Sequence, residues 1–280
     1  MDVTKSVLVV DCDPSVPALV RSCLPGADWN IVCADSLSEA LSSLRERAYD
    51  LVLTSPRTNG FADVELLREM RGVRPHLKMI VLTERSTPEA VIASMRAHAF
   101  SYFVGPFDSR TISEMIERAV TEPAWDDGIE VLSASHEWIS LRLKCRMLTA
   151  ERILHFMNEV RADLPVKERQ DIGTAFREML LNAMEHGGKF DPEQTVEVHR
   201  IRTEHSIIYL IRDPGAGFYL SALPHAAVSN TPMEPFAHAV YREQQGMRPG
   251  GFGILLTKGV VDELVYNEKG NEVMLIKRLV

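Results

Sequence analysis

The stretch Glu178-Met-Leu-Leu-Asn182-Ala-Met-Glu185-His186-Gly187 decides how the C-terminal half of this 280-residue chain folds. As a helix, it places Glu178, Asn182 and either Glu185 or His186 on one face, because residues three and four apart are helical neighbours. The apolar residues between them would face a core. A carboxylate and a carboxamide one turn apart on such a helix suit a hard cation, which prefers oxygen ligands.

Two glycine-rich segments follow this helix along the chain. The first is Asp213-Pro-Gly215-Ala-Gly217, and the second is Gly250-Gly251-Phe-Gly253. Backbone amides in glycine-rich loops and at helix N-termini bind phosphate oxygens. A helix with amide and carboxylate oxygens, followed by two such loops, therefore indicates a nucleotide-binding site.

The surrounding pattern predicts an α+β sandwich over residues 130–280. Amphipathic helices are expected at 149–164, with Thr149 as its N-cap, at 166–186 and at about 252–261. Strands are expected to group against them, at 129–132, 138–143, 195–202, 206–212, 263–267 and 272–279.

The N-terminal part has a different pattern of apolar residues, which predicts a second domain over residues 1–121. Five short, β-branched apolar runs alternate with five helical stretches, which is typical of a doubly wound α/β domain with a parallel sheet. The strands are expected at 7–10, 30–34, 51–54, 79–83 and 101–104. Proline, glycine and adjacent acids at 122–129 break both periods and predict a linker.

Composition excludes several classes of partner. The net charge is −8 with no basic block, which argues against nucleic acid, since phosphate-backbone binding relies on clustered Lys and Arg. The chain shows no signal peptide and no apolar run long enough to span a bilayer, so a cytoplasmic protein without a membrane partner is expected. The cysteines show no C-x-x-C pair and are expected to be free thiols in a reducing compartment; they are Cys12, Cys23, Cys33 and Cys145.

The N-terminal domain resembles the receiver domain of bacterial response regulators, which has a flavodoxin-like sheet. Asp11 and Asp13 follow the first strand, where receivers hold acidic residues for a divalent cation. Thr83 ends the fourth strand, where receivers hold a hydroxyl that senses the phosphate. Pro106-Phe107 matches the usual proline and aromatic residue after the fifth strand.

Two positions depart from the receiver pattern. Ser55 stands where the phosphoacceptor aspartate should end the third strand, and Gly105 replaces the lysine expected before the proline. A serine hydroxyl cannot form the acyl phosphate that the carboxylate forms. We therefore expect a pseudo-receiver used for docking or dimerisation, in which Asp11 and Asp13 are either candidate metal ligands or remnants of a polar loop.

The C-terminal domain resembles the GHKL ATPase superfamily, which includes histidine kinases, a heat-shock chaperone and DNA gyrase. The resemblance implies ATP and Mg²⁺ as cofactors. Asn182 would help to hold Mg²⁺, Asp213 would accept a hydrogen bond from the adenine amino group, and Glu178 would be the general base. The remaining candidate nucleotide-binding residues are Glu185, His186, Gly215, Gly217, Gly251 and Gly253, and Arg248 is a candidate for the γ-phosphate.

Within this superfamily, Glu178-x-x-x-Asn182-Ala-x-Glu185-His186-Gly187 looks most like the bacterial anti-sigma-factor serine/threonine kinases. Those kinases transfer the γ-phosphoryl group to a serine or threonine of an antagonist protein. The implied partner is thus a protein substrate, such as an anti-sigma-factor antagonist, or a sigma factor. Both kinds of domain often dimerise, so a homodimer is also open.

Two other functions stay open from the sequence. One is a non-catalytic module in which ATP controls the binding of a partner protein. The other is a histidine kinase of a phosphorelay, since His136-Glu137 resembles the phosphorylated His-Glu pair of those enzymes. Against the second, residues 129–143 alternate like strands, and no two-helix dimerisation hairpin precedes the ATPase domain.

Overall fold

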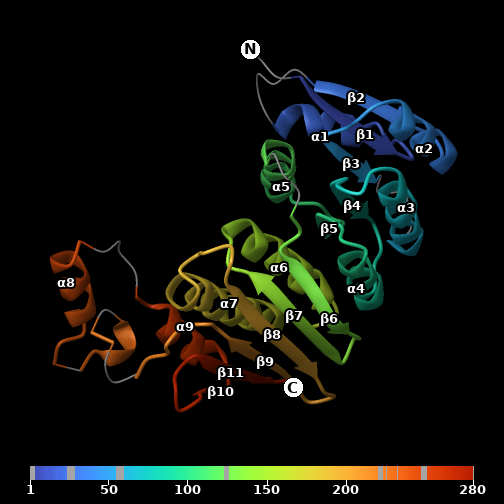
Figure 1. Cartoon of the computed structure of the whole chain (residues 1–280). Helices are drawn as coiled ribbons and strands as arrows, with labels where there is room; N and C mark the ends of the chain where they lie inside the picture. Colours follow the sequence, from blue (N-terminus) through green and yellow to red (C-terminus); the bar gives the residue numbers. More distant parts are fainter. Residues whose placement is uncertain are drawn as a thin grey trace. The chain divides into compact units, whose positions relative to one another are not determined.

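The computed structural model describes residues 4–23, 29–54, 60–122, 126–219, 223–224, 226–231, 233–246 and 251–279 (Figure 1). The chain forms two compact units. The first comprises residues 1–127 with 155–160, and the second comprises 128–154 with 161–280.

The first unit is a five-stranded sheet in the order β2-β1-β3-β4-β5, with all neighbours parallel. Helices alternate with the strands along the chain, which confirms the predicted doubly wound α/β domain (Figure 1). In chain order the elements are β1 (Lys5–Val10), α1 (Ser15–Cys23), β2 (Trp29–Ala34), α2 (Leu37–Glu46), β3 (Leu51–Thr54), α3 (Gly60–Val73), β4 (Met79–Thr83), α4 (Pro88–Arg96), β5 (Ser101–Val104) and α5 (Ser109–Thr121).

Local signals in the sequence explain where these elements lie. Strands β3 and β4 are buried at every position, as expected of central strands covered on both faces. Ser36, Thr87 and Asp108 each accept a hydrogen bond from a backbone amide in the first turn of the helix that follows, and so act as N-caps of α2, α4 and α5.

The cysteines of this unit correct one prediction. Cys12 and Cys33 are joined in a disulfide, with Cα atoms 5.5 Å apart. The parallel register pairs Val9 with Cys33, and Asp11 donates its backbone N–H to Ala34, so the loop after β1 lies beside the end of β2. The expectation of free thiols was wrong for this pair because residues 21 positions apart become neighbours only through strand pairing.

The second unit is a six-stranded antiparallel sheet in the order β10-β11-β9-β8-β7-β6 (Figure 1). This agrees with the predicted α+β sandwich. The elements are β6 (Ile129–Ala134), β7 (Trp138–Lys144), α6 (Met147–Val160), α7 (Val166–Asn182), β8 (Thr195–Arg202), β9 (Ser206–Arg212), α8 (Ala237–Gln244), α9 (Gly253–Val260), β10 (Glu263–Tyr266) and β11 (Glu272–Arg278).

Helices α7 and α9 pack against each other and onto one face of this sheet. Burial alternates along the strands accordingly. In β8 and β9 every second residue is buried towards the helices, and the residues between them lie on the opposite face. Among them, Tyr209 stacks on Phe176 of α7 with ring centroids 4.6 Å apart.

Three details of the second unit differ from the predictions. Helix α6 begins at Met147, so Thr149 is not an N-cap; it is buried inside the first turn, against Gly128. Helix α7 ends at Asn182 and continues as a π-helical turn, Ala183–Gly187. Helix α8 was not predicted at all.

In the part of the chain that the structure describes, no helix is long and apolar enough to cross a membrane.

Candidate functional site

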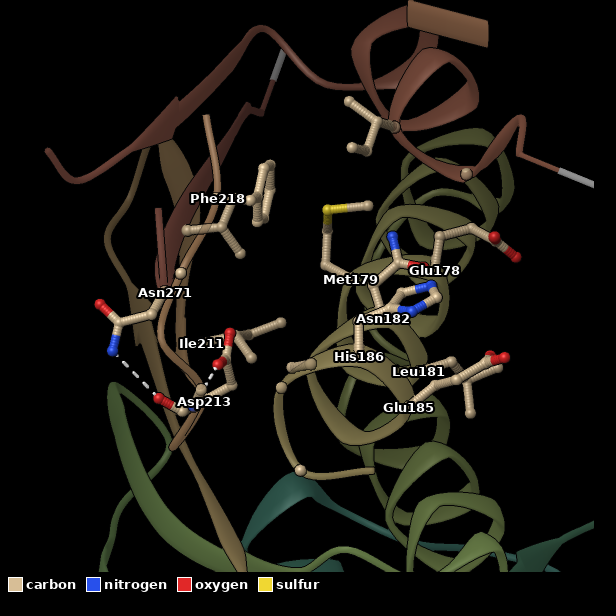
Figure 2. Close-up of a pocket in the computed structure, with 18 of the residues that line it drawn as sticks. Glu178, Met179, Leu181, Asn182, Glu185, His186, Ile211, Asp213, Phe218 and Asn271 are labelled. Atoms are coloured by element: carbon tan, nitrogen blue, oxygen red, sulfur yellow. Dashed lines mark hydrogen bonds between the residues drawn. The ribbon is translucent and has the colours of Figure 1, made fainter. Parts of the chain in front are cut away.

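A cavity of about 1100 Å³ in the second unit brings the three sequence motifs together (Figure 2). It lies between the C-terminal end of α7, the loop after β9 and the start of α9. Apart from Arg248, its lining contains the nucleotide-binding and catalytic residues predicted for this domain, namely Glu178, Asn182, Glu185, His186, Asp213, Gly215, Gly217, Gly251 and Gly253.

The helix side of the cavity is shaped by the π-helical turn. Gly188 donates its backbone N–H to the carbonyl of Ala183 at 2.9 Å, five residues back, so the last turn is wider than an α-helical one. Such turns inside α-helices often occur at functional sites. Figure 2 shows Asn182 and His186 on the cavity side of the helix, while Glu185 points away from Asp213.

On the strand side, Asp213 is packed against the π-helical turn. A Cβ atom on Gly187 would lie 2.2 Å from the Asp213 carboxyl, so only glycine fits at position 187 without displacing that side chain. The Oδ1 atom of Asp213 accepts the backbone N–H of Gly215 at 2.7 Å. That bond fixes the carboxyl group and leaves its other oxygen available to a ligand.

The backbone of Asp213 is held from β11. Asp213 donates its N–H to the carbonyl of Asn271 at 2.9 Å, and the Asn271 side chain donates to the carbonyl of Asp213 at 3.1 Å. Burial raises the pKa of Asp213, and the hydrogen bond from Gly215 opposes this shift. The carboxyl group is thus held in place at a half-buried position that suits a single polar contact to a flat, mostly apolar ligand.

Apolar side chains complete this end of the cavity. Tyr266 of β10 donates its hydroxyl to the sulfur of Met179 at 3.4 Å, and its ring meets Phe218 edge to face at 5.1 Å. Burial, reinforced by the charge of Asp213, raises the pKa of Tyr266, which favours its neutral form. Together with Ile211, these residues form an apolar slot beside the Asp213 carboxyl, as an aromatic base requires.

The second glycine of the Asp213 loop has a structural role that the sequence did not reveal. Gly217 has a φ of 84°, and a Cβ atom there would lie 1.9 Å from the carbonyl oxygen of Lys269. Gly270 has a φ of 78° and meets the carbonyl of Phe218 in the same way. The two loops interlock, so both glycines are needed for backbone–backbone contact.

The start of α9 faces the polar residues of α7. A Cβ atom on Gly253 would lie 2.7 Å from the Glu178 carboxylate and 3.5 Å from the Asn182 side-chain nitrogen. Glu178 also contacts its neighbour Arg177, with 3.3 Å between Nη1 and Oε1. A carboxylate, a carboxamide and a helix N-terminus therefore meet at this end of the cavity. Side-chain oxygens of this kind can bind a magnesium ion, and the backbone amides of a helix N-terminus can bind phosphate oxygens.

Among the cavity residues that were missed from the sequence is an arginine. Arg242 of α8 lines the cavity and is 8% exposed. Arg248, the arginine predicted to reach the γ-phosphate, lies outside the described residues. His238 and Arg242 are four residues apart and therefore share one face of α8, and both are buried. This spacing is the pattern in the sequence that could have indicated Arg242.

The first unit has two candidate sites, the predicted metal ligands Asp11 and Asp13 and the phosphoacceptor position at Ser55. Asp11 lies directly after β1, and Asp13 uses Oδ1 to accept the backbone N–H and the hydroxyl of Ser15 at the start of α1. Among the described residues, no group of three or more His, Cys, Asp or Glu side chains could hold a metal ion. Ser55 lies outside the described residues, so its predicted position at the end of β3 stays a prediction.

Comparison with known families agrees with both units. Residues 144–277 match the histidine kinase-like ATPase domain, and residues 7–117 match the response regulator receiver domain. An ATPase-like domain of this kind implies ATP binding.

Individual relatives match part of the chain. The transcriptional regulatory protein ZraR of Salmonella typhimurium strain LT2 is 27% identical over 182 residues, which cover 64% of this chain and 40% of that protein. The DNA-binding transcriptional regulator NtrC of Escherichia coli K12 is 29% identical over 115 residues, which cover 41% of this chain and 24% of that protein. A response regulator from Thermotoga maritima is 27% identical and covers 43% of this chain and 100% of its own, with a TM-score of 0.38. The chain thus spans less than half the length of these curated relatives.

Proposed function

Because the chain joins a response regulator receiver domain to a histidine kinase-like ATPase domain, we propose that it is an ATP-binding signalling protein that phosphorylates a partner protein on serine or threonine. The observation that carries this proposal is the convergence of Glu178, Asn182 and Asp213 on one cavity. The partner we propose is an anti-sigma-factor antagonist or a sigma factor, and the reaction would take place in the cytoplasm.

Each end of the cavity has its own role in this proposal. Asp213 accepts a hydrogen bond from the adenine amino group while Met179, Phe218 and Tyr266 enclose the ring. Asn182 offers its side-chain oxygen to Mg²⁺, which would neutralise charge on the phosphates. The amides at the start of α9, beginning at Gly253, donate to phosphate oxygens.

Glu178 is the proposed general base. Its carboxylate takes the proton of the substrate hydroxyl while the hydroxyl oxygen bonds to the γ-phosphorus and ADP leaves. Arg242 lies on the same cavity and is our candidate for a cationic contact to the γ-phosphate.

The test is transfer of label from [γ-³²P]ATP, with Mg²⁺, to candidate antagonist proteins of the same genome. Acid-stable label on serine or threonine is expected. Glu178→Gln should keep ATP binding and lose transfer, whereas Glu168→Gln, at the far end of α7, should behave like the parent protein. Acid-labile label would instead indicate a histidine kinase, and full transfer by the Glu178 variant would refute the base assignment.

One observation favours a second candidate, an ATP-gated binding module without transfer. The segment around α8 carries exposed apolar side chains, with Met233 90% and Phe236 68% exposed, and it lines the cavity through Arg242. A nucleotide that reorders this segment would alter an apolar surface. Partner binding that depends on ATP, with no labelled product, would support this module over the kinase.

The names of the relatives raise DNA as a partner, but we propose a protein partner instead. The match to NtrC covers 24% of that protein, and the present chain has a net charge of −8 without a basic block.

A further inference from the structure

Three arginines lie close together in the second unit, and two of them are enclosed in its interior. Arg200 of β8 is 0% exposed, and Arg161, in the segment between α6 and α7, is 2% exposed. Arg202 lies two residues beyond Arg200 on β8 and therefore points to the same face of the sheet. Arginine is almost never fully buried unless it is paired, so this group of side chains requires a partner.

Tyr209 of β9 joins two of these arginines. It pairs with Arg200 in the register of β8 and β9, and its hydroxyl accepts a hydrogen bond from Nη1 of Arg161 at 3.2 Å. Burial lowers the pKa of Arg200, a shift that Tyr209 opposes. The charges of Arg202 and Arg161 lower this pKa further. The three guanidinium groups are therefore near enough to repel one another.

One carboxylate offsets part of this positive charge. Oδ2 of Asp163 lies 2.5 Å from Nη1 of Arg202. Among the described residues, Asp163 is the only carboxylate whose charge raises the pKa of Arg200. Because guanidinium groups keep their charge in proteins, the three arginines and Asp163 together have an excess of about two positive charges.

The hydrogen bonds of Arg200 leave one edge of its guanidinium group open. Nη1 donates to the backbone carbonyl of His136 at 2.8 Å. In the part of the chain that the structure describes, Nε and Nη2 of Arg200 and Nε of Arg161 are buried without a hydrogen-bond partner. Nε and Nη2 share one edge of the planar group and form a fork that matches two oxygens of an oxyanion. Because unpaired buried donors destabilise a fold, these donors indicate a ligand with several acceptor oxygens.

This cluster is separate from the nucleotide cavity. Tyr209 lies four residues before Asp213, or about 13 Å away along an extended strand. The three arginines are not among the residues that line the cavity. On the solvent side of the cluster, the side chains of Asp163 and Arg202 are 35% and 20% exposed. A small ion could therefore reach the buried donors past this partly exposed pair.

From the buried arginines, the excess positive charge and the open guanidinium edge, we propose that this cluster binds a small tetrahedral oxyanion, phosphate or sulfate. A dianion of this kind offsets the excess charge and supplies oxygens to Arg200 and Arg161 together. Water could accept from the same donors but brings no charge, and chloride cannot span the fork with two atoms. The bound ion would join β8 to the segment before α7 and stabilise the second unit.

The test is the melting temperature of the full chain, by differential scanning calorimetry, in phosphate, in sulfate and in chloride at equal ionic strength. Three charge-assisted hydrogen bonds should give a dissociation constant of about 0.1–1 mM. Phosphate or sulfate at about 10 mM should then raise the melting temperature by about 3–10 °C relative to chloride. Equal melting temperatures in the three salts would overturn the proposal, and this is the result expected if buried water satisfies the donors.

Variants show where the ions act. Arg200→Met removes the fork and its charge but keeps an unbranched side chain, so it should lose the shift while binding ATP as the parent protein does. Arg142→Met, at a partly exposed arginine of β7, should keep the shift. If the Arg200 variant responded like the parent protein, the proposal would be overturned, because the ions would act at the nucleotide cavity or as general stabilisers.

Circular dichroism checks that each variant is folded. Should Arg200→Met fail to fold, Arg161→Lys provides the second variant, because lysine keeps the positive charge but lacks the Nε donor. Titration calorimetry should then show phosphate binding weakened at least about fivefold. Unchanged phosphate affinity in that variant would equally contradict the proposed site.

Discussion

Asp213 provides the sharpest test of the nucleotide site, through the conservative substitution Asp213→Asn. One carboxylate oxygen accepts the N–H of Gly215 at 2.7 Å, which leaves the other for the adenine amino group. Asparagine has one oxygen and one NH₂ group. Whichever way the amide turns, NH₂ must face either the Gly215 N–H or the adenine amino group, and two donors then oppose each other.

The expected loss follows from this geometry. A hydrogen bond to a charged group contributes about 1.5–3 kcal/mol, so ATP affinity should fall about 10- to 150-fold. GTP should respond differently, because guanine carries a carbonyl where adenine has its amino group. The asparagine NH₂ can donate to that carbonyl, so the preference for ATP over GTP should narrow or reverse.

Isothermal titration calorimetry with ATP and GTP measures both quantities in the parent protein and the variant. Glu204→Gln, in the exposed turn between β8 and β9, makes a matched neutralisation away from the cavity and should change neither affinity. If Asp213→Asn bound ATP as tightly as the parent protein, Asp213 would not contact the base. An equal loss for ATP and GTP would point to a general distortion of the pocket instead.

Four further predictions test other features of the chain. Gly187→Ala should weaken ATP binding at least about tenfold and lower the melting temperature, because its methyl group would lie 2.2 Å from the Asp213 carboxyl; unchanged binding would mean that the π-helical turn adapts freely. ATP affinity should fall on acidification with a midpoint above 3.8, the ordinary pKa of an aspartate, because burial raises the pKa of Asp213 and only the ionised carboxylate accepts the adenine N–H; Asp213→Asn should lack this step in a pH series of titrations. Cys33→Ser should lower the free energy of unfolding of the first unit by about 3 kcal/mol in urea, because the Cys12–Cys33 disulfide closes a loop with a sequence separation of 21; a reductant should destabilise the parent protein equally and the variant not at all. Acetyl phosphate with Mg²⁺ should leave the mass of the protein unchanged, because we expect Ser55 to stand where receivers have the phosphoacceptor aspartate; a stable adduct on an aspartate would contradict this.

The sequence predicted the regular elements closely where a single period dominated. Strands β4, β5, β8 and β9 begin and end at the predicted residues, because continuous or alternating apolar runs leave little choice of structure. The motif residues also meet in one cavity. They could be selected from the sequence because the residue types at the end of α7 and in the two glycine-rich loops are those that bind nucleotides. Their individual roles stay predictions until the variants are measured.

Helix α8 shows why other parts escaped prediction. Sequence patterns assume that apolar residues face inward, yet α8 buries His238 and Arg242 and exposes Val240, which is 52% exposed. A helix that covers a polar cavity inverts the usual pattern, so its period was not recognised. The Cys12–Cys33 disulfide escaped for another reason, because only the register of β1 and β2 makes the two residues neighbours.

The π-helical turn Ala183–Gly187 has a consequence for how this domain can change over time. A turn closed over five residues holds one more residue than an α-helical turn, so it resembles a single-residue insertion that the helix has absorbed. Deleting one residue there would restore a regular helix and rotate His186 and Gly187 out of phase with Asn182. Gly187 would then no longer lie against Asp213, and the two walls of the cavity would lose their fit. The length of this segment therefore cannot change without separating the magnesium end of the site from the base end.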